Sequence, residues 1–172
     1  GSDATNYNVS ITNADLTIGK ASATVTANSA NVTYNGQTQT VTGFTASGLV
    51  GGESETVLSG VSTSGGSGRH AGSHAHTASG TDGNYNLSFV DGALTIAKAN
   101  ASVTGSTTQV TYNGTTQTQS APTSSGFISG DAITFSGAAS GKNAGTYTSA
   151  LQVSGSDATN YNVSITNADL TI

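Results

Sequence analysis

The feature that most constrains this chain is an internal repeat. The string GSDATNYNVSITNADLTI occupies residues 1–18 and recurs letter for letter at residues 155–172. A diverged copy, GTDGNYNLSFVDGALTI, occupies residues 80–96. Chance does not produce an identity of this length. Such self-similarity is typical of chains that fold as arrays of one structural unit.

The longer segments between these strings repeat as well. Residues 19–58 align with residues 97–136 without gaps and share 18 identities in 40 positions. The shared landmarks include the triplet Tyr-Asn-Gly, at residues 34–36 and again at residues 112–114. The resulting unit of roughly 76 to 78 residues is too long for one coil of a β-solenoid and suits a small independent domain.

The repeats predict a division of the chain. Residues 1–18 are interpreted as the C-terminal hairpin of a preceding repeat, residues 19–96 as repeat module 1 and residues 97–172 as repeat module 2. A different phase, with modules at about 1–80 and 81–158, remains open on the sequence alone. In either phase we expect the chain to be an internal stretch of a longer protein.

Short strands account for the pattern within each unit. Ala21, Ala23, Val25 and Ala27 alternate with Ser and Thr, the period of two that marks a half-buried strand. Gly and Asn, which favour turns, are frequent between such runs, and no window of useful length has helical periodicity. The sequence therefore predicts an all-β fold of tandem small immunoglobulin-like β-sandwich modules arranged end to end.

The end of the unit is predicted to be a hairpin. Tyr161, Val163 and Ile165 alternate along one strand, residues 166–169 are expected to turn the chain, and Leu170 begins the return strand. No linker-like segment separates this hairpin from the next unit in the earlier copy, so we expect successive modules to join without slack.

Composition excludes several classes of function. Only four residues are basic, Lys20, Arg69, Lys98 and Lys142, against nine acidic ones, for a net charge of −5. Such a chain cannot neutralise a row of phosphates, so we expect no nucleic-acid partner. It contains no apolar run near the roughly 20 residues of a transmembrane helix, so we expect no membrane insertion. Cysteine is absent, which excludes disulfides and thiol chemistry.

Three histidines, His70, His74 and His76, form the one candidate metal cluster in the sequence. On a strand, His74 and His76 would project from the same face about 7 Å apart, a workable spacing for two ligands of zinc or nickel. The alternative is that they are ordinary surface histidines, because no nearby carboxylate or Cys completes the set and the second copy has Tyr147 and Ser149 at those places.

Other site chemistry has weaker signals. A calcium site at a module junction is the one cofactor considered, with Glu53 and Asp131 in equivalent loops, but no calcium-binding loop motif is present and turn capping explains the acidic residues as well. We expect no enzyme, because a repeated module should repeat its catalytic residues and the histidines occur in one unit only. Six sequons make the following residues glycosylation candidates: Asn8, Asn31, Asn86, Asn100, Asn113 and Asn162.

Several strings together resemble a known family. NAGTYT at residues 143–148, NYN at 160–162, ADLTI at 168–172 and SGLVGGE at 47–53 occur in the order found in the MBG/YDG-type repeats of large bacterial adhesins. The resemblance covers nearly the whole chain; residues 68–76 depart from it. It implies a secreted or cell-surface location, filamentous haemagglutinin-like exoproteins as parents, and adjacent repeats of the same polypeptide as the main partners.

The resemblance favours one function and leaves rivals open. We expect structural stalk or spacer repeats of a bacterial adhesin involved in cell adhesion, with any host-surface or glycan ligand bound elsewhere in the parent protein. One rival is direct binding of a glycan or host protein by exposed Tyr, Asn and Thr side chains. The other is homotypic self-association, as in biofilm or aggregation, through residues 1–18, which lack the body they should pack on.

Overall fold

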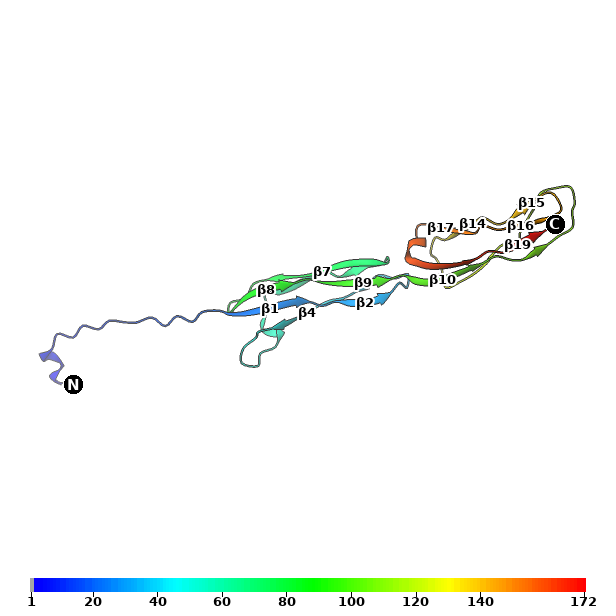
Figure 1. The fold of residues 1–172 in the computed structure, drawn as a ribbon. Coiled ribbons are helices and arrows are strands. Elements are labelled where there is room, and N and C mark those ends of the chain that lie inside the picture. The colour runs from blue at the N-terminus through cyan, green and yellow to red at the C-terminus, as the bar shows by residue number, and fades with distance from the viewer. Residues whose placement is uncertain (1) are drawn as a thin grey trace.

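The computed structural model describes residues 2–172, and its fold is all-β, as the alternation predicts. Nineteen strands are joined by loops and three short 3-10 helices, η1 (Ser2–Asn6), η2 (Glu55–Val57) and η3 (Ala158–Asn160). Figure 1 shows an elongated molecule in which the strands form two groups, residues 21–97 and residues 99–171, that follow one another along its length. Among the described residues, no helix has both the length and the apolar character needed to cross a bilayer.

The strands of residues 21–97 form two sheets and a short ladder. One sheet has the order β4-β1-β8, and the other has the order β2-β9-β7-β5. The bounds are β1 (Ala21–Ala27), β2 (Ala30–Thr33), β4 (Phe44–Ser47), β5 (Val61–Gly65), β7 (Gly72–Gly80), β8 (Tyr85–Val90) and β9 (Gly92–Ala97). The ladder pairs β3 (Gln39–Thr40) with β6 (Ser67–Gly68).

The strands of residues 99–171 repeat this pattern of partners in shorter pieces. The sheet β13-β10-β18 corresponds to β4-β1-β8, and the sheet β11-β19-β16 corresponds to β2-β9-β7. The two remaining ladders are the pairs β12-β15 and β14-β17. The bounds are β10 (Ala99–Thr104), β11 (Thr108–Gln109), β12 (Gln117–Thr118), β13 (Thr123–Ser125), β14 (Thr134–Ser136), β15 (Ser140–Gly141), β16 (Thr146–Thr148), β17 (Gln152–Ser154), β18 (Tyr161–Thr166) and β19 (Asp169–Thr171).

The start and the end of each group lie side by side as parallel strands. β1 pairs with β8 in a register that places Ala21 opposite Tyr85, and β10 pairs with β18 in a register that places Ala99 opposite Tyr161. The chain then continues from β1 into β2 and from β8 into β9, and β2 and β9 are again parallel neighbours. The same ribbon of two parallel strands is thus built twice.

This arrangement corrects the predicted closing hairpin. β18 and β19 do not pair with each other: β18 pairs with β10, whereas β19 lies in a different sheet between β11 and β16. Residues 167 and 168 carry the chain from one sheet to the other instead of reversing it. The alternation identified both strands correctly, but a period of two does not specify which strand is the neighbour.

The core lies where the alternation places it. Ala23, Val25 and Ala27 of β1 are buried, with exposed fractions of 4%, 0% and 1%, while the Ser and Thr residues between them are more exposed. They pack with Leu58 and Tyr85 in a first apolar cluster. A second cluster combines residues from both groups of strands, and the contact between the groups is built around it.

The repeated 18-residue string has two conformations in one molecule. At residues 155–172 it forms β18 and β19, where Tyr161 is 4% and Leu170 is 0% exposed. At residues 2–18 it forms only η1, and the matching Tyr7 and Leu16 are 74% and 87% exposed. Because an isolated strand has no neighbour for its backbone donors and acceptors, the string becomes β-structure only where the rest of a repeat supplies one. The boundaries of the repeat modules stay a prediction.

Candidate functional site

The two groups of strands meet at a cluster of polar and aromatic side chains, called the junction here. Its centre is Asp131, whose Oδ2 accepts hydrogen bonds from the hydroxyl groups of Tyr34, at 2.8 Å, and Tyr161. Tyr34 belongs to residues 21–97, whereas Asp131 and Tyr161 belong to residues 99–171. One carboxylate therefore ties both groups together.

The tyrosine rings pack as well as donate hydrogen bonds. The Tyr34 and Tyr161 rings meet edge to face, with centroids 5.5 Å apart and an interplanar angle of 81°. The Phe127 ring also packs against Tyr161, with centroids 4.9 Å apart. Edge-to-face pairs of this kind are favourable beyond the area that they bury. Both tyrosines are almost fully buried, at 3% and 4% exposed.

Local structure explains how the rings reach each other. Tyr34 directly follows β2, and its backbone N–H donates to the carbonyl of Ala97 at 2.8 Å, which fixes the end of β2 against β9. Tyr161 is the first residue of β18, opposite Ala99 of β10. The chain passes from β9 to β10 through one residue, Lys98, so both tyrosines are held close to the connection between the groups.

A salt bridge completes the centre of the junction. Arg69 Nη2 lies 3.1 Å from Asp131 Oδ1, and the Asp131 side chain is only 2% exposed. Arg69 Nε also donates to the carbonyl of Gly36 at 2.9 Å, so the guanidinium bridges the Tyr-Asn-Gly turn and the carboxylate. A buried carboxylate needs such partners, because burial without them is costly.

A second set of hydrogen bonds crosses the junction beside the first. Asn160 is 1% exposed; its Oδ1 accepts a hydrogen bond from the backbone N–H of Ala71 at 2.9 Å, and its Nδ2 lies 3.2 Å from His70 Nδ1. His70 Nδ1 also lies 3.9 Å from a carboxylate oxygen of Asp157. His70, which the sequence grouped with a candidate metal site, therefore lies in the contact between the groups.

The junction changes the acidity of its tyrosines. Burial and the hydrogen bond to Asp131 raise the pKa of Tyr34 from its ordinary value of 10.0 to about 12, although Arg69 opposes the shift. Burial and the same acceptor raise the pKa of Tyr161. A phenol that donates to a carboxylate resists ionisation because phenolate would face a second negative charge. Both groups are therefore hydrogen-bond donors over the physiological pH range.

The sequence of the first group of strands is similar to a known family. Residues 23–95, which include β2 to β8 and most of β1 and β9, match the family described as MBG domain, YGX type. Residues 23–95 are similar to an MBG-type repeat. The suspected MBG-type repeat is supported over these residues, which contain one of the four strings that suggested it, SGLVGGE at 47–53. There is no match among curated proteins and none among solved structures.

The MBG-type repeat has, at its other end, a second copy of half of the junction, called the socket here: Val50, Glu53, Asn84 and Tyr85. The gapless alignment places Val50 and Glu53 at the positions of Ile128 and Asp131. The Tyr85 hydroxyl donates to Glu53 as Tyr161 donates to Asp131. Tyr85 Oη also accepts from the backbone N–H of Val50 at 3.0 Å, as Tyr161 Oη accepts from Ile128 at 2.9 Å.

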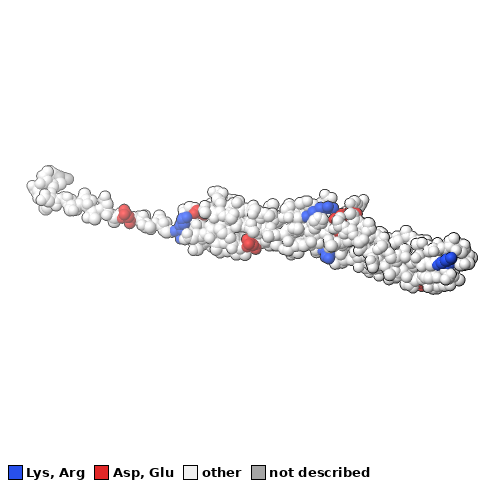
Figure 2. Space-filling model, turned by 90° about the horizontal axis from the view of Figure 1, so that it is seen from above, with Lys and Arg blue, Asp and Glu red and all other residues white. Residues whose placement is uncertain are grey.

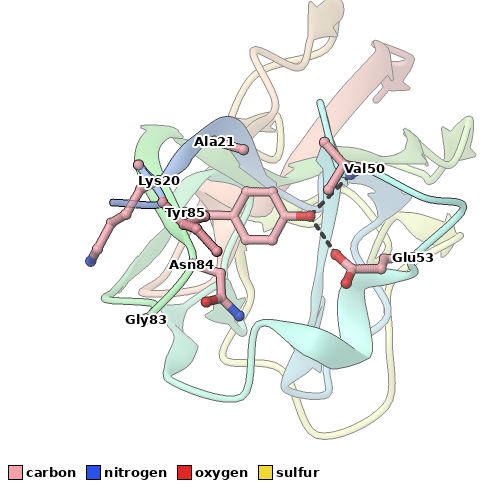
Figure 3. Close-up of a pocket in the computed structure, with 9 residues that line it drawn as sticks. Lys20, Ala21, Val50, Glu53, Gly83, Asn84 and Tyr85 are labelled. Atoms are coloured by element: carbon pink, nitrogen blue, oxygen red, sulfur yellow. Dashed lines mark hydrogen bonds between the residues drawn. The ribbon is translucent and has the colours of Figure 1, made fainter. Parts of the chain in front are cut away.

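Figure 3 shows the socket as an open pocket. The Tyr85 ring lies at its centre with its hydroxyl toward Val50 and Glu53, Asn84 lies beside the ring, and the Lys20 ammonium points away. The pocket has a volume of about 410 Å³, and its wall is completed by residues 18–21 and Gly83. The hydrogen bond to Glu53 raises the pKa of Tyr85, although the hydrogen bond from the Val50 backbone opposes the shift.

The matching half of the junction is exposed in residues 99–171, and it is called the tip here: Tyr112, Asn113, Gly114 and Lys142. Tyr112 is 55% exposed, whereas Tyr34 at the equivalent position is 3% exposed. Lys142 follows Gly141 of the β12-β15 ladder as Arg69 follows Gly68 of the β3-β6 ladder. The tip therefore presents a tyrosine, an Asn-Gly turn and a cation in the places occupied by Tyr34, Gly36 and Arg69.

The histidines proposed as zinc or nickel ligands both lie on β7. His74 Nε2 lies 2.9 Å from the carbonyl of His70, and His76 Nδ1 lies 2.7 Å from the carbonyl of Asn28. A carbonyl only accepts, so both of these nitrogens carry protons and donate. Within residues 2–172, no group of three His, Cys, Asp or Glu side chains is arranged to hold a metal ion. Metal binding by His74 and His76 stays a prediction.

The six sequon asparagines share one property: their side chains are exposed at the surface, as modification requires. Four of them lie on strands whose inward residues are apolar, and Asn100 lies directly opposite Asn162 in the β10-β18 pair. Glycosylation at these sites stays a prediction. Calcium binding at the junction also stays a prediction; Asp131, which it would involve, has both oxygens engaged by Arg69 and the tyrosines.

Sequence reasoning missed the junction itself. It recognised Glu53 and Asp131 as equivalent and noted the repeated tyrosines, but it did not connect them. The available signal was that each unit repeats one tyrosine after the first strand, one acidic residue in the middle and one tyrosine in the final string. A buried tyrosine needs a hydrogen-bond partner, and the repeated acid was the candidate.

Proposed function

We propose that this chain is a length of stalk, or spacer, in a bacterial adhesin that is secreted or held at the cell surface. The role is structural and non-enzymatic: it sets the distance between two other parts of the protein. The observation that supports it is the junction, in which Asp131 accepts from Tyr34 and Tyr161 and pairs with Arg69. A spacer needs joints that do not bend, and such a joint requires directional contacts.

Two further features favour a stiff connection. Lys98 alone separates β9 from β10, which leaves no slack for independent tumbling. The apolar cluster at the junction includes Leu94 and Ile96 from one group and Ala101 and Tyr161 from the other. Packed apolar side chains resist sliding, while the hydrogen bonds to Asp131 fix the rotation about the long axis.

The surface fits a spacer that avoids unwanted contacts. Charged residues make up 8% of the chain, and the face seen in Figure 2 has few charged atoms, with acidic and basic ones together near the middle of the molecule. Most of the polar surface is Ser, Thr, Asn and Gly. MBG-type repeats are compatible with adhesin-like proteins, and on this proposal the receptor or glycan is bound elsewhere in the parent protein.

The test is the distance across the junction. Because the chain lacks cysteine, Ser59→Cys and Ala138→Cys introduce two unique labelling sites at exposed positions on either side of it. Pulsed electron spin resonance on the doubly labelled protein should give one narrow distance distribution. A broad distribution in the otherwise unaltered chain would contradict a rigid spacer.

A matched pair of variants links the distance to the junction. Asp131→Ala should broaden the distribution, because Tyr34, Arg69 and Tyr161 lose their shared partner. Glu53→Ala removes the equivalent carboxylate at the socket, outside the junction, and should leave the distribution narrow. Specific binding of this chain to a glycan array would favour the rival receptor function instead.

A further inference from the structure

We propose that His76 and Gln119 do the same task in their two groups of strands by incompatible means, and that this incompatibility keeps neighbouring groups from exchanging strands. The task is to hold the crossing, the point at which the ribbon of parallel strands passes from one sheet to the other. Asn28, between β1 and β2, marks the crossing in the first group, and Ser106, between β10 and β11, marks it in the second. The inference concerns how each group closes on itself and does not depend on the proposed function.

One backbone carbonyl at each crossing accepts a hydrogen bond from a buried side chain. Asn28 and Ser106 occupy the same position in the gapless alignment. The donor to Asn28 is His76 Nδ1, at 2.7 Å, and the donor to Ser106 is Gln119 Nε2, at 2.9 Å; Thr108 Oγ1 adds a local bond to Ser106 at 3.1 Å. His76 is 1% and Gln119 is 5% exposed. Between strands a carbonyl has no ladder partner, so a side chain must supply the donor.

The two donors come from different places in the fold. His76 lies on β7, whereas Gln119 directly follows β12. In the first group, the position of Gln119 is taken by Val41, which directly follows β3. In the second group, the position of His76 is taken by Ser149. Each group therefore has one long donor at this pair of positions, and neither group has both.

The space around His76 fits the first group only. Val41 and Gln119 each donate their backbone N–H at 2.8 Å, to the carbonyls of Gly66 and Ala139, so Gly66 and Ala139 are equivalent. A Cβ built on Gly66 would lie 2.9 Å from His76 Cγ and 2.9 Å from Val41 Cγ1. The imidazole thus leaves no room for a methyl group there. The second group has a serine in place of the imidazole and an alanine in place of the glycine.

Gln119 fills the corresponding space in the second group. Its Nε2 donates to the carbonyl of Ala168 at 2.9 Å, and its Oε1 accepts from the backbone N–H of Ala139 at 3.1 Å. Ala168 lies between β18 and β19, so the amide joins both strands of the ribbon at the crossing. An imidazole in place of Ser149 would overpack this site, because the amide is already held by bonds at both of its ends.

A strand taken from the wrong group therefore meets a mismatch. β7 in the second group would bring His76 against Gln119, two donors in the space of one. β16 with Ser149 in the first group would face Val41, and the Asn28 carbonyl would lose its donor beside a cavity. Adjacent repeats of similar sequence are prone to misassembly and swapping. Specificity against a similar partner requires a penalty of this kind for the wrong pairing.

A double-mutant cycle in the full-length chain tests the incompatibility. Val41→Gln alone and His76→Ser alone reproduce the two mismatches, and each should lower the melting temperature by roughly 2–10 °C. The double variant has the pair of residues that the second group uses. It should melt above the His76→Ser variant, because the glutamine amide replaces the lost donor. A double variant that melts at or below the His76→Ser variant would overturn the proposal.

A control separates hydrogen bonding from the filling of space. Methionine has nearly the length of glutamine but no amide, so Val41→Met combined with His76→Ser fills the cavity without restoring a donor. This pair should melt below the pair that carries Val41→Gln. Equal melting temperatures would show that volume alone accounts for the recovery and would overturn the role given to the donor.

Nuclear magnetic resonance of the unaltered chain tests the donor without any substitution. The nitrogen-15 spectrum of the histidine rings should show the proton of His76 on Nδ1, and the proton of His74, whose Nε2 faces the carbonyl of His70, on Nε2. A bare Nδ1 on His76 would overturn the proposal even if a variant failed to fold. The label distance across the junction should stay narrow in the double variant, so failure at the crossing leaves the spacer test intact.

Discussion

The Tyr34 hydroxyl donates a hydrogen bond of 2.8 Å to Asp131, a residue 97 positions further along the chain. The same carboxylate accepts a hydrogen bond from the Tyr161 hydroxyl and forms a salt bridge with Arg69. Asn160 makes further contacts across the two groups of strands, to Ala71 and His70, and Asp131 lies at the centre of the joint. Substitution of that side chain is the most direct experiment on the fold.

Asp131→Asn should lower the free energy of unfolding by about 1.5–3 kcal/mol, the range for hydrogen bonds to a charged group. The amide keeps the shape of the carboxylate but removes the charge that Arg69 and the two tyrosines share. Urea denaturation measures the change. Glu53→Gln is the matched control at the exposed socket, and its effect should stay within about 0.5 kcal/mol. Equal effects of the two substitutions would contradict the role assigned to Asp131.

The raised pKa of Tyr34 predicts how stability depends on pH. The folded state favours the protonated phenol, so its contribution is complete below the ordinary pKa of 10.0 and is lost as the pH rises through about 12. The free energy of unfolding should therefore fall over this alkaline range. Tyr34→Phe should make the fall smaller. When the ultraviolet absorbance titration of this variant is subtracted from that of the unaltered protein, the remaining transition should be centred near pH 12 instead of pH 10. A transition centred near pH 10 would contradict the hydrogen bond from Tyr34 to Asp131.

Gly36 and Gly114 form a natural control pair for the junction. Both have positive φ, so alanine imposes similar backbone strain of about 1–2 kcal/mol at either position. Only at Gly36 does the new Cβ meet Ile128. Gly36→Ala should cost about 1–3 kcal/mol more than Gly114→Ala, the range for overpacking. Thermal unfolding of the two variants, each compared with the unaltered chain, measures this difference.

The repeated string offers an equally close comparison of two leucines. Leu170 and Leu16 have the same neighbours in sequence, but Leu170 is fully buried while Leu16 is 87% exposed. Leu170→Ala should cost about 2–5 kcal/mol through lost burial and a residual cavity. Leu16→Ala should change stability by less than about 0.5 kcal/mol. A large effect at Leu16 would show that residues 1–18 pack on the protein in solution.

Much of the fold follows from the pattern of side chains. The alternation of Ala23, Val25 and Ala27 with small polar residues predicted a half-buried strand, and β1 has that burial. The predicted hairpin at the end was wrong because β18 and β19 are each satisfied by strands from earlier in the chain. Local sequence records which face of a strand is apolar, but partner choice depends on packing between residues far apart.

The candidate site was less predictable than the fold. The sequence indicated that Glu53 and Asp131 are equivalent, yet their surroundings differ: Asp131 is enclosed by Tyr34 and Arg69, while Glu53 faces solvent. That difference arises from position along the molecule and not from the residues themselves. Arg69 was counted only as one of four scattered cations, because its partner is 62 residues away.

The parallel pairing of the first and last strands has a consequence for a protein under load. The chain enters residues 21–97 at β1 and leaves at the end of β9, and these ends belong to the parallel pairs β1-β8 and β2-β9. Traction on both ends pulls the two sides of this ribbon in opposite directions along their length. Its hydrogen bonds are then sheared together, whereas a terminal antiparallel hairpin would unzip one bond at a time. Resistance to pulling is therefore a property of the strand order, available to a chain with no disulfide and a sparse core.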